Sequence, residues 1–373
     1  SATLTSGTYP RRSASTPSQA WSQRLWQALT ALGQRRATAH LGQLALQYAA
    51  QAAQRKAERH GHFRLVLPSQ WHGMFGPDVT YHELRDAMRL RHRFPVDLDV
   101  WHGLHQHMRY RPPVNSKRNI ITVHDLNHVY AKKGLSLWWQ NLRLTRHLRR
   151  AHQLVAITQF VADDIRRCLP WAPPAVVIHN GAADLTQHAQ TPVTDLVGQS
   201  YLLHISRMSA SKNVGALIDM VAGWPEQGLV LVGPDSPEVE AHRLRVKSMG
   251  LRNVRFVTDV DEAQKAWLYA HCEAFLFPSL MEGFGLPPIE AMFFGKPVIV
   301  ARRTCLPEVC GEAAAYWDDF SAPAMRKVVE AWLTQHQQDG DLTQRVTAQA
   351  RRYAWPRAAR QYQTLYEQGL TAC

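Results

Sequence analysis

Cysteine pairs, long apolar runs and an apolar leader are all missing from this sequence. The five cysteines are odd in number and show no CxxC spacing, which favours free thiols in a reduced cytosolic setting. No apolar run approaches the roughly 18 residues that a membrane-spanning helix needs. Residues 1–20 are rich in Ser, Thr, Pro and Ala and lack the apolar core of a secretory signal. We therefore expect a cytoplasmic protein, which would act at the inner face of the cell membrane if it meets lipid at all.

Acidic residues are scarce in the first half of the chain. Residues 1–180 contain 25 Lys and Arg against 9 Asp and Glu, a balance of +16, whereas the remainder has a balance of −3. Fourteen of the 19 histidines also lie in the first half. This asymmetry predicts an anionic partner for the N-terminal half alone. Nucleic acid, an anionic membrane surface or a phosphorylated glycan would each provide the negative charge.

Short apolar runs alternate with helical patterns along the chain, whose 373 residues suit two domains rather than one. Such alternation predicts parallel sheets wrapped by helices. After a poorly ordered start at 1–17, we expect helices at 18–32, 41–59, 79–93, 135–150 and 158–168. Strands are expected between them at 63–67, 99–101, 120–123, 154–157 and 176–178.

A polar, turn-prone stretch at 183–199 is predicted to link this half to a second alternating set. Its strands are expected at 201–205, 228–232, 254–257, 274–277 and 297–300. Its helices are expected at 213–221, 238–248, 262–270 and 288–294. The chain thus reads as two Rossmann-like units in tandem, followed by a tail at 344–368 with an apolar helical face.

Two carboxylates, Glu282 and Glu290, stand eight positions apart and bracket a Gly-Phe-Gly-Leu-Pro-Pro run. An apolar strand is predicted just before them, and the Pro-Pro pair suits the first turn of a helix. Gly283 and Gly285 permit backbone conformations that a Cβ would forbid. A helix N-terminus presents unpaired N–H groups and a partial positive charge, so this unit suits phosphate or sugar hydroxyls. Glu290, about one turn into the helix, can accept hydrogen bonds from hydroxyls beside that phosphate.

This segment resembles the signature of the retaining GT-B glycosyltransferases of family GT4 (glycosyl transferases group 1), in which two Glu flank seven residues. The match extends to Gly-Lys-Pro-Val-Ile-Val at 295–300 and Leu-Pro-Glu-Val at 306–309. The resemblance implies an α/β GT-B fold, with two Rossmann-like domains facing a cleft and a C-terminal helix that returns to the N-terminal domain. The implied divisions are an acceptor-binding domain at 1–183, a nucleotide-sugar-binding domain at 184–352 and the returning helix at 353–373.

The resemblance also implies roles for residues of the second half. Arg207 and Lys212 follow a predicted strand and match the family's pair of cations that contact the donor phosphates. Arg can bind two phosphate oxygens at once, while Lys acts as a mobile point charge. Glu282 is assigned to the hydroxyls of the donor sugar and Glu290 to the ribose. The remaining donor-binding loop is Gly283, Phe284, Gly285 and Leu286.

In the first half, a predicted strand at 120–123 ends in the pair His124-Asp125. Open α/β sheets bind ligands at the carboxyl ends of their strands. By resemblance, His124 faces the donor sugar and joins Glu282, Arg207 and Lys212 in the catalytic set. Asp125 is assigned to the acceptor or to orienting loops. His102, which follows another strand in the same way, is assigned to the acceptor.

The implied mechanism is a front-face transfer with retention, in which the leaving phosphate helps to deprotonate the acceptor. No cofactor and no metal are expected, because enzymes of this fold usually stabilise the leaving diphosphate with cations and a helix dipole. Asp259-Val-Asp261 is a literal DxD, the metal-binding pattern of GT-A transferases. However, Asp261 and Gln264 have the spacing of a capping box that opens a helix.

The expected partners are a nucleotide-sugar donor and a glycan or lipid-linked acceptor of envelope polysaccharide or lipopolysaccharide synthesis. An anionic membrane surface is a further candidate, because arginines at 85, 89, 91, 93, 143, 146, 149 and 150 accompany Trp138 and Trp139. Nucleic acid is disfavoured, since no binding motif for it is present. The alternatives left open are a catalytically silent GT-B subunit, a nucleic-acid-binding protein and a nucleotide-sugar epimerase.

The sequence leaves the nucleotide base, the donor sugar, the acceptor, the linkage and the oligomeric state undefined. Most members of the family begin with an apolar strand and a Gly-rich loop. Residues 1–8 depart from that pattern, with one Gly and little strand character.

Overall fold

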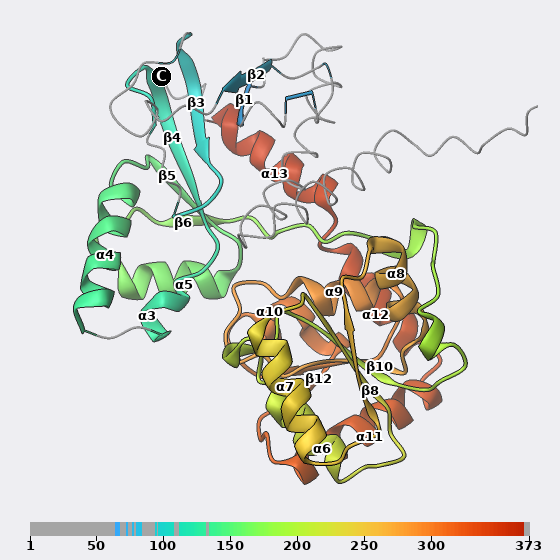
Figure 1. The fold of residues 1–373 in the computed structure, drawn as a ribbon. Coiled ribbons are helices and arrows are strands. Elements are labelled where there is room, and N and C mark those ends of the chain that lie inside the picture. The colour runs from blue at the N-terminus through green and yellow to red at the C-terminus, as the bar shows by residue number, and fades with distance from the viewer. Residues whose placement is uncertain are drawn as a thin grey trace, which may run out of the picture. The chain divides into compact units, whose positions relative to one another are not determined.

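The computed structural model describes residues 64–67, 72–73, 77, 80–83, 94, 96–107, 112–131 and 134–368 (Figure 1). The chain divides into two units, Ser1–Arg85 and Asp86–Cys373. The features expected at 1–17, 18–32 and 41–59, the N-terminal strand and its Gly loop, and the arginines at 85–93 lie outside the described residues.

In the first unit, β1 (Arg64–Leu67) and β2 (Thr80–Glu83) pair in parallel. β1 confirms the strand expected at 63–67. β2 contradicts the first part of the helix expected at 79–93. Thr80 is β-branched and Tyr81 aromatic, residue types that favour strands, and β1 supplies a partner for their backbone hydrogen bonds.

The second unit begins with a parallel sheet in the order β3-β4-β5-β6, among the described residues. Its two central strands are buried at their carboxyl ends, where Ile120–Val123 of β4 and Leu154–Ala156 of β5 are almost fully covered. All four strands overlap the predicted ones. The strands are β3 (Leu98–Gly103), β4 (Ser116–Val123), β5 (Gln153–Ala156) and β6 (Ala175–Val177), and the helices between them are α3 (Asn127–Ala131), α4 (Gly134–Leu148) and α5 (Gln159–Cys168).

A second parallel sheet follows the segment at 183–199, in the order β12-β11-β10-β7-β8-β9. The strand order reverses between β7 and β10, which makes that point the topological switch where doubly wound sheets bind ligands. Five of these strands match predictions, whereas the edge strand β12 was not expected from the sequence. The strands are β7 (Leu202–Ile205), β8 (Leu229–Gly233), β9 (Val254–Thr258), β10 (Ala274–Phe277), β11 (Val298–Ala301) and β12 (Ala315–Trp317).

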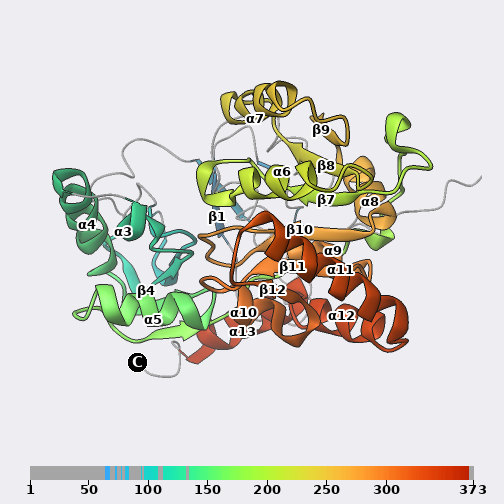
Figure 2. The ribbon, with the colours of Figure 1, turned by 90° about the horizontal axis from the view of Figure 1, so that it is seen from below.

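Helices cover both faces of this second sheet. Figure 1 shows α8, α9 and α12 on one face and α6, α7 and α11 on the other, and the view in Figure 2 separates α6 and α7 from α12. α9 packs against α12 and α8, while α6 packs against α11. The helices are α6 (Val214–Ala222), α7 (Pro237–Ser248), α8 (Glu262–His271), α9 (Leu286–Phe293), α10 (Leu306–Cys310), α11 (Ala322–Gln338) and α12 (Leu342–Arg351).

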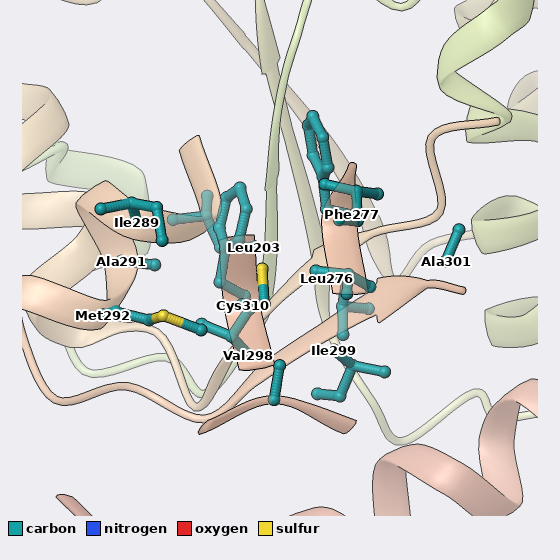
Figure 3. Packing of buried hydrophobic residues seen from close by; sticks show 14 of the residues in the cluster. Leu203, Leu276, Phe277, Ile289, Ala291, Met292, Val298, Ile299, Ala301 and Cys310 are labelled. Atoms are coloured by element: carbon teal, nitrogen blue, oxygen red, sulfur yellow. The ribbon is translucent and has the colours of Figure 1, made fainter. Parts of the chain in front are cut away.

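The core of the second sheet is almost entirely aliphatic and aromatic. All residues of β10 and β11 are buried, and α9 buries nearly its whole length against them. Figure 3 shows Ile289 and Met292 of α9 gathered with Leu203, Leu276 and Val298 of the strands. A fully packed base of this kind holds the loops at the carboxyl ends of the strands in fixed positions.

The last helix, α13 (Trp355–Gln368), packs against the first sheet of the same unit. The Tyr366 hydroxyl lies 2.7 Å from Nδ1 of His102 on β3, and the Tyr362 hydroxyl lies 3.1 Å from Oγ1 of Thr122 on β4. The C-terminal helix therefore returns to the N-terminal half, as the resemblance implied. None of the described helices is both long and apolar enough to cross a lipid bilayer. The four described cysteines, Cys168, Cys272, Cys305 and Cys310, are free thiols as expected.

Candidate functional site

The loop that joins β10 to α9 carries the two-glutamate motif to the switch point of the second sheet. Gly285 caps α9 with a φ of 89°, and a Cβ there would also lie 2.7 Å from Cδ2 of Leu306. The left-handed backbone conformation is what favours glycine here, since the Leu306 side chain could shift. Proline occupies the first turn of α9, and Gly295 follows its end with a φ of 66°. The predicted strand, glycine loop and helix N-terminus are therefore confirmed.

Gly283 lies directly against the end of β4. A Cβ on Gly283 would collide with the carbonyl oxygen of His124, so only glycine permits this approach. The Thr158 hydroxyl, at the N-cap of α5, donates a hydrogen bond of 3.2 Å to the Gly283 carbonyl. The structure thus brings the two-glutamate loop and His124 together, as the sequence predicted.

The loop after β7 supplies a cation to the same place. Lys212 ends the short 3-10 turn Ala210–Lys212, and its ammonium forms an ion pair with the Glu282 carboxylate. Both side chains are 13% exposed. The ammonium also lies 5.3 Å from the centre of the Phe277 ring. Further hydrogen bonds tie the two loops, since the Leu280 N–H and the Ser279 hydroxyl both donate to the Ser211 carbonyl.

A buried histidine that the sequence did not single out fixes the start of the β7 loop. Nδ1 of His204 donates to the Leu276 carbonyl at 2.7 Å, and burial lowers the His204 pKa to about 4. The neutral ring then accepts from the Ser206 hydroxyl through Nε2, at 2.7 Å. Ser206 Oγ in turn accepts from the Met208 N–H. These bonds hold the backbone on both sides of the half-buried Arg207.

Glu290 is 7% exposed, on the part of α9 that faces α8. Its Oε2 accepts a hydrogen bond of 2.9 Å from the Tyr269 hydroxyl and lies 2.5 Å from the Lys265 ammonium. The sequence singled out neither partner. Lys265 and Tyr269 share one face of α8 because they are four positions apart.

The loop after β3 fixes His124. Nε2 of His124 donates to the Leu104 carbonyl at 2.8 Å, and its ring stacks on His105 with 5.0 Å between the centroids. Burial, with a smaller contribution from His105, lowers the His124 pKa to about 4, so the imidazole is neutral at physiological pH. Gln106, which the sequence did not single out, is fully buried. Its amide accepts from the His124 N–H and donates to the Asp125 carbonyl.

Asp125 and His102 are placed in structural hydrogen bonds. Asp125 accepts from the Asn127 N–H at 3.0 Å and so opens α3. Nε2 of His102 lies 2.8 Å from the Thr122 hydroxyl, while its Nδ1 faces Tyr366 of α13. Burial lowers the His102 pKa to about 3, so this ring is also neutral. Their roles toward an acceptor stay predictions.

Glu308 of α10 makes further polar contacts with the half of the chain that contains the first sheet. Its carboxylate accepts from the N–H groups of Gln159 and Phe160, at 2.7 and 2.9 Å, and from Nε2 of His179 at 2.8 Å. The first two donors belong to the first turn of α5, which a carboxylate stabilises. The sequence contained Glu308 within a matching motif, but nothing in it indicated a cap formed across the fold.

Asp261 belongs to a complete capping box at the start of α8, in which it accepts from the Gln264 N–H while the Gln264 side chain reaches back. The helix-capping interpretation of the DxD sequence is therefore confirmed.

Known proteins resemble this chain in sequence. Residues 191–352 match the family described as glycosyl transferases group 1. The O-antigen chain mannosyltransferase B of Escherichia coli is 26% identical over 291 residues, which cover 72% of this chain and 74% of that protein.

Solved structures share the fold. Sucrose-phosphate synthase from Thermosynechococcus elongatus aligns with a TM-score of 0.60 at 22% identity, covering 69% of each chain. Anabaena Alr3699/HepE, solved in complex with UDP-glucose, aligns with a TM-score of 0.57 at 20% identity, covering 69% of this chain and 72% of its own. The fold is GT-B, as the two-glutamate signature implied.

Proposed function

We propose that this chain, whose residues 191–352 match the glycosyl transferases group 1 family, transfers a hexosyl residue, mannosyl by preference, from a nucleotide sugar to a cell-surface polysaccharide. The acceptor class follows the relative described as an O-antigen chain mannosyltransferase. The domain boundaries proposed from the sequence, at 183/184 and 352/353, fall outside every strand and helix.

The observation that carries this proposal is the meeting of Lys212, Glu282 and the N-terminus of α9 at the switch point of a doubly wound sheet. A diphosphate placed there would meet the ammonium, Arg207 of the same β7 loop and the partial positive charge at the N-terminus of α9. The complex of UDP-glucose with a protein of the same fold supports a donor of this class.

The remaining roles follow from this placement. A diphosphate that engages Lys212 releases Glu282 from its ion pair, and the freed carboxylate accepts from donor-sugar hydroxyls. His124, neutral and anchored by Leu104 and Gln106, lies beside Gly283. Glu290 accepts from the ribose. We propose retention of the anomeric configuration through front-face attack, with the leaving phosphate accepting the acceptor proton and no metal taking part.

The proposal also includes binding of the protein to a membrane surface that carries the acceptor. On α4, Leu135, Trp138 and Trp139 are exposed near the start of the helix, and Arg143, Arg146, Arg149 and Arg150 are exposed toward and just beyond its end. Aromatic and aliphatic side chains beside arginines suit the interface of an anionic bilayer. We propose that α4 rests on the inner face of the cell membrane, where a lipid-linked acceptor would be presented.

The test is a transfer assay with mannose-terminated oligosaccharide acceptors and a panel of UDP-, GDP- and ADP-sugars. We expect one donor to yield a glycosylated product, and the configuration of the new bond, read by NMR, to match that of the donor. Glu290→Ala should raise the KM for that donor, while exchange of the exposed Lys247 for Ala should change nothing.

Other outcomes of the assay identify the alternatives. Donor conversion to an isomeric nucleotide sugar without acceptor would indicate an epimerase. Binding of RNA or DNA without donor turnover would indicate a nucleic-acid-binding protein, and binding of the donor alone a silent subunit. Loss of activity in EDTA and its return with manganese would contradict the metal-free mechanism.

A further inference from the structure

Glu290 has two partners on one face of α8, and both contact the same carboxylate oxygen. The Lys265 ammonium and the Tyr269 hydroxyl lie 2.5 and 2.9 Å from Oε2. Among the described residues, no hydrogen bond reaches Oε1. One oxygen of this carboxylate is therefore held while the other keeps its accepting capacity.

The Lys265–Glu290 pair differs from an ordinary surface ion pair in its burial. Side chains of the two residues are 14% and 9% exposed, whereas exposed pairs of long side chains contribute little. At these exposures each charge depends on the other, because an unpaired charge in such a place would be strongly unfavourable. A short, nearly buried pair also restricts the rotamers of both side chains.

A second carboxyl group, that of Glu262, lies near Lys265. Glu262 lies one turn before Lys265 on α8, and burial raises its pKa to about 7. His188 faces Glu262, with Nδ1 3.7 Å from Oε2. Lys265 therefore lies among two carboxyl groups, those of Glu290 and Glu262, and is paired with Glu290.

We propose that Lys265 is the positioning residue for the donor ribose: with Tyr269 it holds Oε2 of Glu290, so that Oε1 is presented to the ribose hydroxyls. This inference rests on the proposed function, because it takes Glu290 as the ribose contact. It adds a residue whose type the two-glutamate motif does not specify. A lysine that only joined α8 to α9 would affect stability and leave ribose recognition unchanged.

The test measures recognition of the ribose separately from binding of the diphosphate. Isothermal titration calorimetry gives the Kd of the nucleoside diphosphate that binds the wild type best, among UDP, GDP and ADP, and of its 2′-deoxy and 3′-deoxy analogues. We expect the wild type to prefer the ribonucleotide over at least one analogue by about tenfold, or about 1.4 kcal/mol, because the missing hydroxyl would donate to a charged carboxylate. Lys265→Met should reduce that preference to about twofold or less, and Glu290→Gln should do the same.

Two further variants separate positioning from folding. Lys265→Arg retains the cation and should keep most of the preference, and Tyr269→Phe, which removes one hydroxyl from Oε2, should reduce it in part. Lys247→Met, an exposed lysine on α7, is the matched control and should behave as the wild type. In steady-state assays Lys265→Met should raise the KM for the donor far more than it lowers kcat.

The possible failures are distinguishable. If Glu290→Gln loses the preference while Lys265→Met and Tyr269→Phe keep it in full, the role of Lys265 is wrong and the donor site stands. If the wild type binds the diphosphate but shows no preference for ribose, the ribose role of Glu290 fails, and this inference with it. If the wild type binds none of the nucleotides, the proposed function itself is overturned.

Discussion

The Lys212 ammonium and the Glu282 carboxylate form an ion pair between the loops that follow β7 and β10. These are the strands between which the order of the second sheet reverses. The pair keeps both side chains in place before a donor arrives, and it compensates two charges that water scarcely reaches. A diphosphate would provide Lys212 with a stronger anionic partner and free the carboxylate for the sugar.

Lys212→Met should leave Glu282 as an uncompensated charge in a nearly buried place. Loss of one partner of such a pair destabilises a protein by about 3–5 kcal/mol, whereas loss of both costs much less. We expect Lys212→Met to lower the urea midpoint more than the double variant Lys212→Met/Glu282→Leu does. An additive result would contradict the coupling. Turnover should fall by about 10²–10³-fold in each variant that lacks Lys212, because a cation at the leaving group is gone.

Glu308→Gln should destabilise the protein through the start of α5. Burial alone would raise the pKa of Glu308, but hydrogen bonds from His179 and from the Gln159 and Phe160 N–H groups outweigh it and lower the pKa below 4.5. A carboxyl whose pKa is lowered by folding contributes stability above its unfolded pKa, and that contribution is lost as pH falls through the folded value. At pH 7 the free energy of unfolding should therefore be about 1–2 kcal/mol larger for the wild type than for Glu308→Gln.

The pH dependence of this stability difference tests whether the charge of Glu308 is responsible for it. The difference in stability between wild type and Glu308→Gln should shrink as the pH falls below 4.5. A difference that stayed unchanged down to pH 3.5 would mean that the charge of this carboxylate does not stabilise α5.

His102 should make folding stability fall in mild acid. Its folded pKa of about 3 lies below the ordinary value of 6.5, so at pH below 6.5 the unfolded chain binds a proton that the folded chain does not. Stability is then lost progressively between pH 6.5 and 3, at about 1.4 kcal/mol per pH unit. His102→Gln should unfold with a smaller loss between pH 7 and pH 5, measured by urea melts. An identical loss in both proteins would show that His102 is charged in the fold.

α4 should bind anionic vesicles through its tryptophans. Trp138 and Trp139 are 55% and 56% exposed, and arginines follow them along the helix. We expect Trp138→Ser/Trp139→Ser to reduce co-sedimentation with phosphatidylglycerol-containing vesicles at least tenfold, and salt to weaken the wild type further. Leu244→Ser, which removes an equally exposed apolar residue from α7, serves as the control. Wild-type binding that ignored lipid charge and salt would refute the membrane proposal.

Most of the second half could be predicted because its signals are local. An apolar run predicts the strand at 274–277, and prolines mark the start of the helix after it. Gly285 lies between them in a backbone conformation that only glycine adopts readily. Where each residue type favours the conformation that the fold requires, few other structures are compatible with the sequence. β12 was missed because Ala315–Trp317 is a three-residue edge strand with too short a pattern to detect.

The side-chain partners of the site could not be predicted in the same way. Lys265 looks like any charged residue on a helix, and only the packing of α8 on α9 brings it to Glu290. Gln106 and Glu308 likewise act on backbone groups 18 and about 150 positions away. The error at β2 has the same origin, because pairing with β1 is a long-range contact that overrides a local helical pattern.

The measurement that tests the central claim most directly is donor binding by the wild type and by Glu290→Ala under identical conditions. Titration calorimetry with the donor selected in the transfer assay should give one site per chain, and Glu290→Ala should weaken it by about tenfold or more. The matched control Lys247→Ala should bind as the wild type does. Equal affinity in wild type and Glu290→Ala, with both proteins folded, would contradict the placement of the donor at the two-glutamate loop.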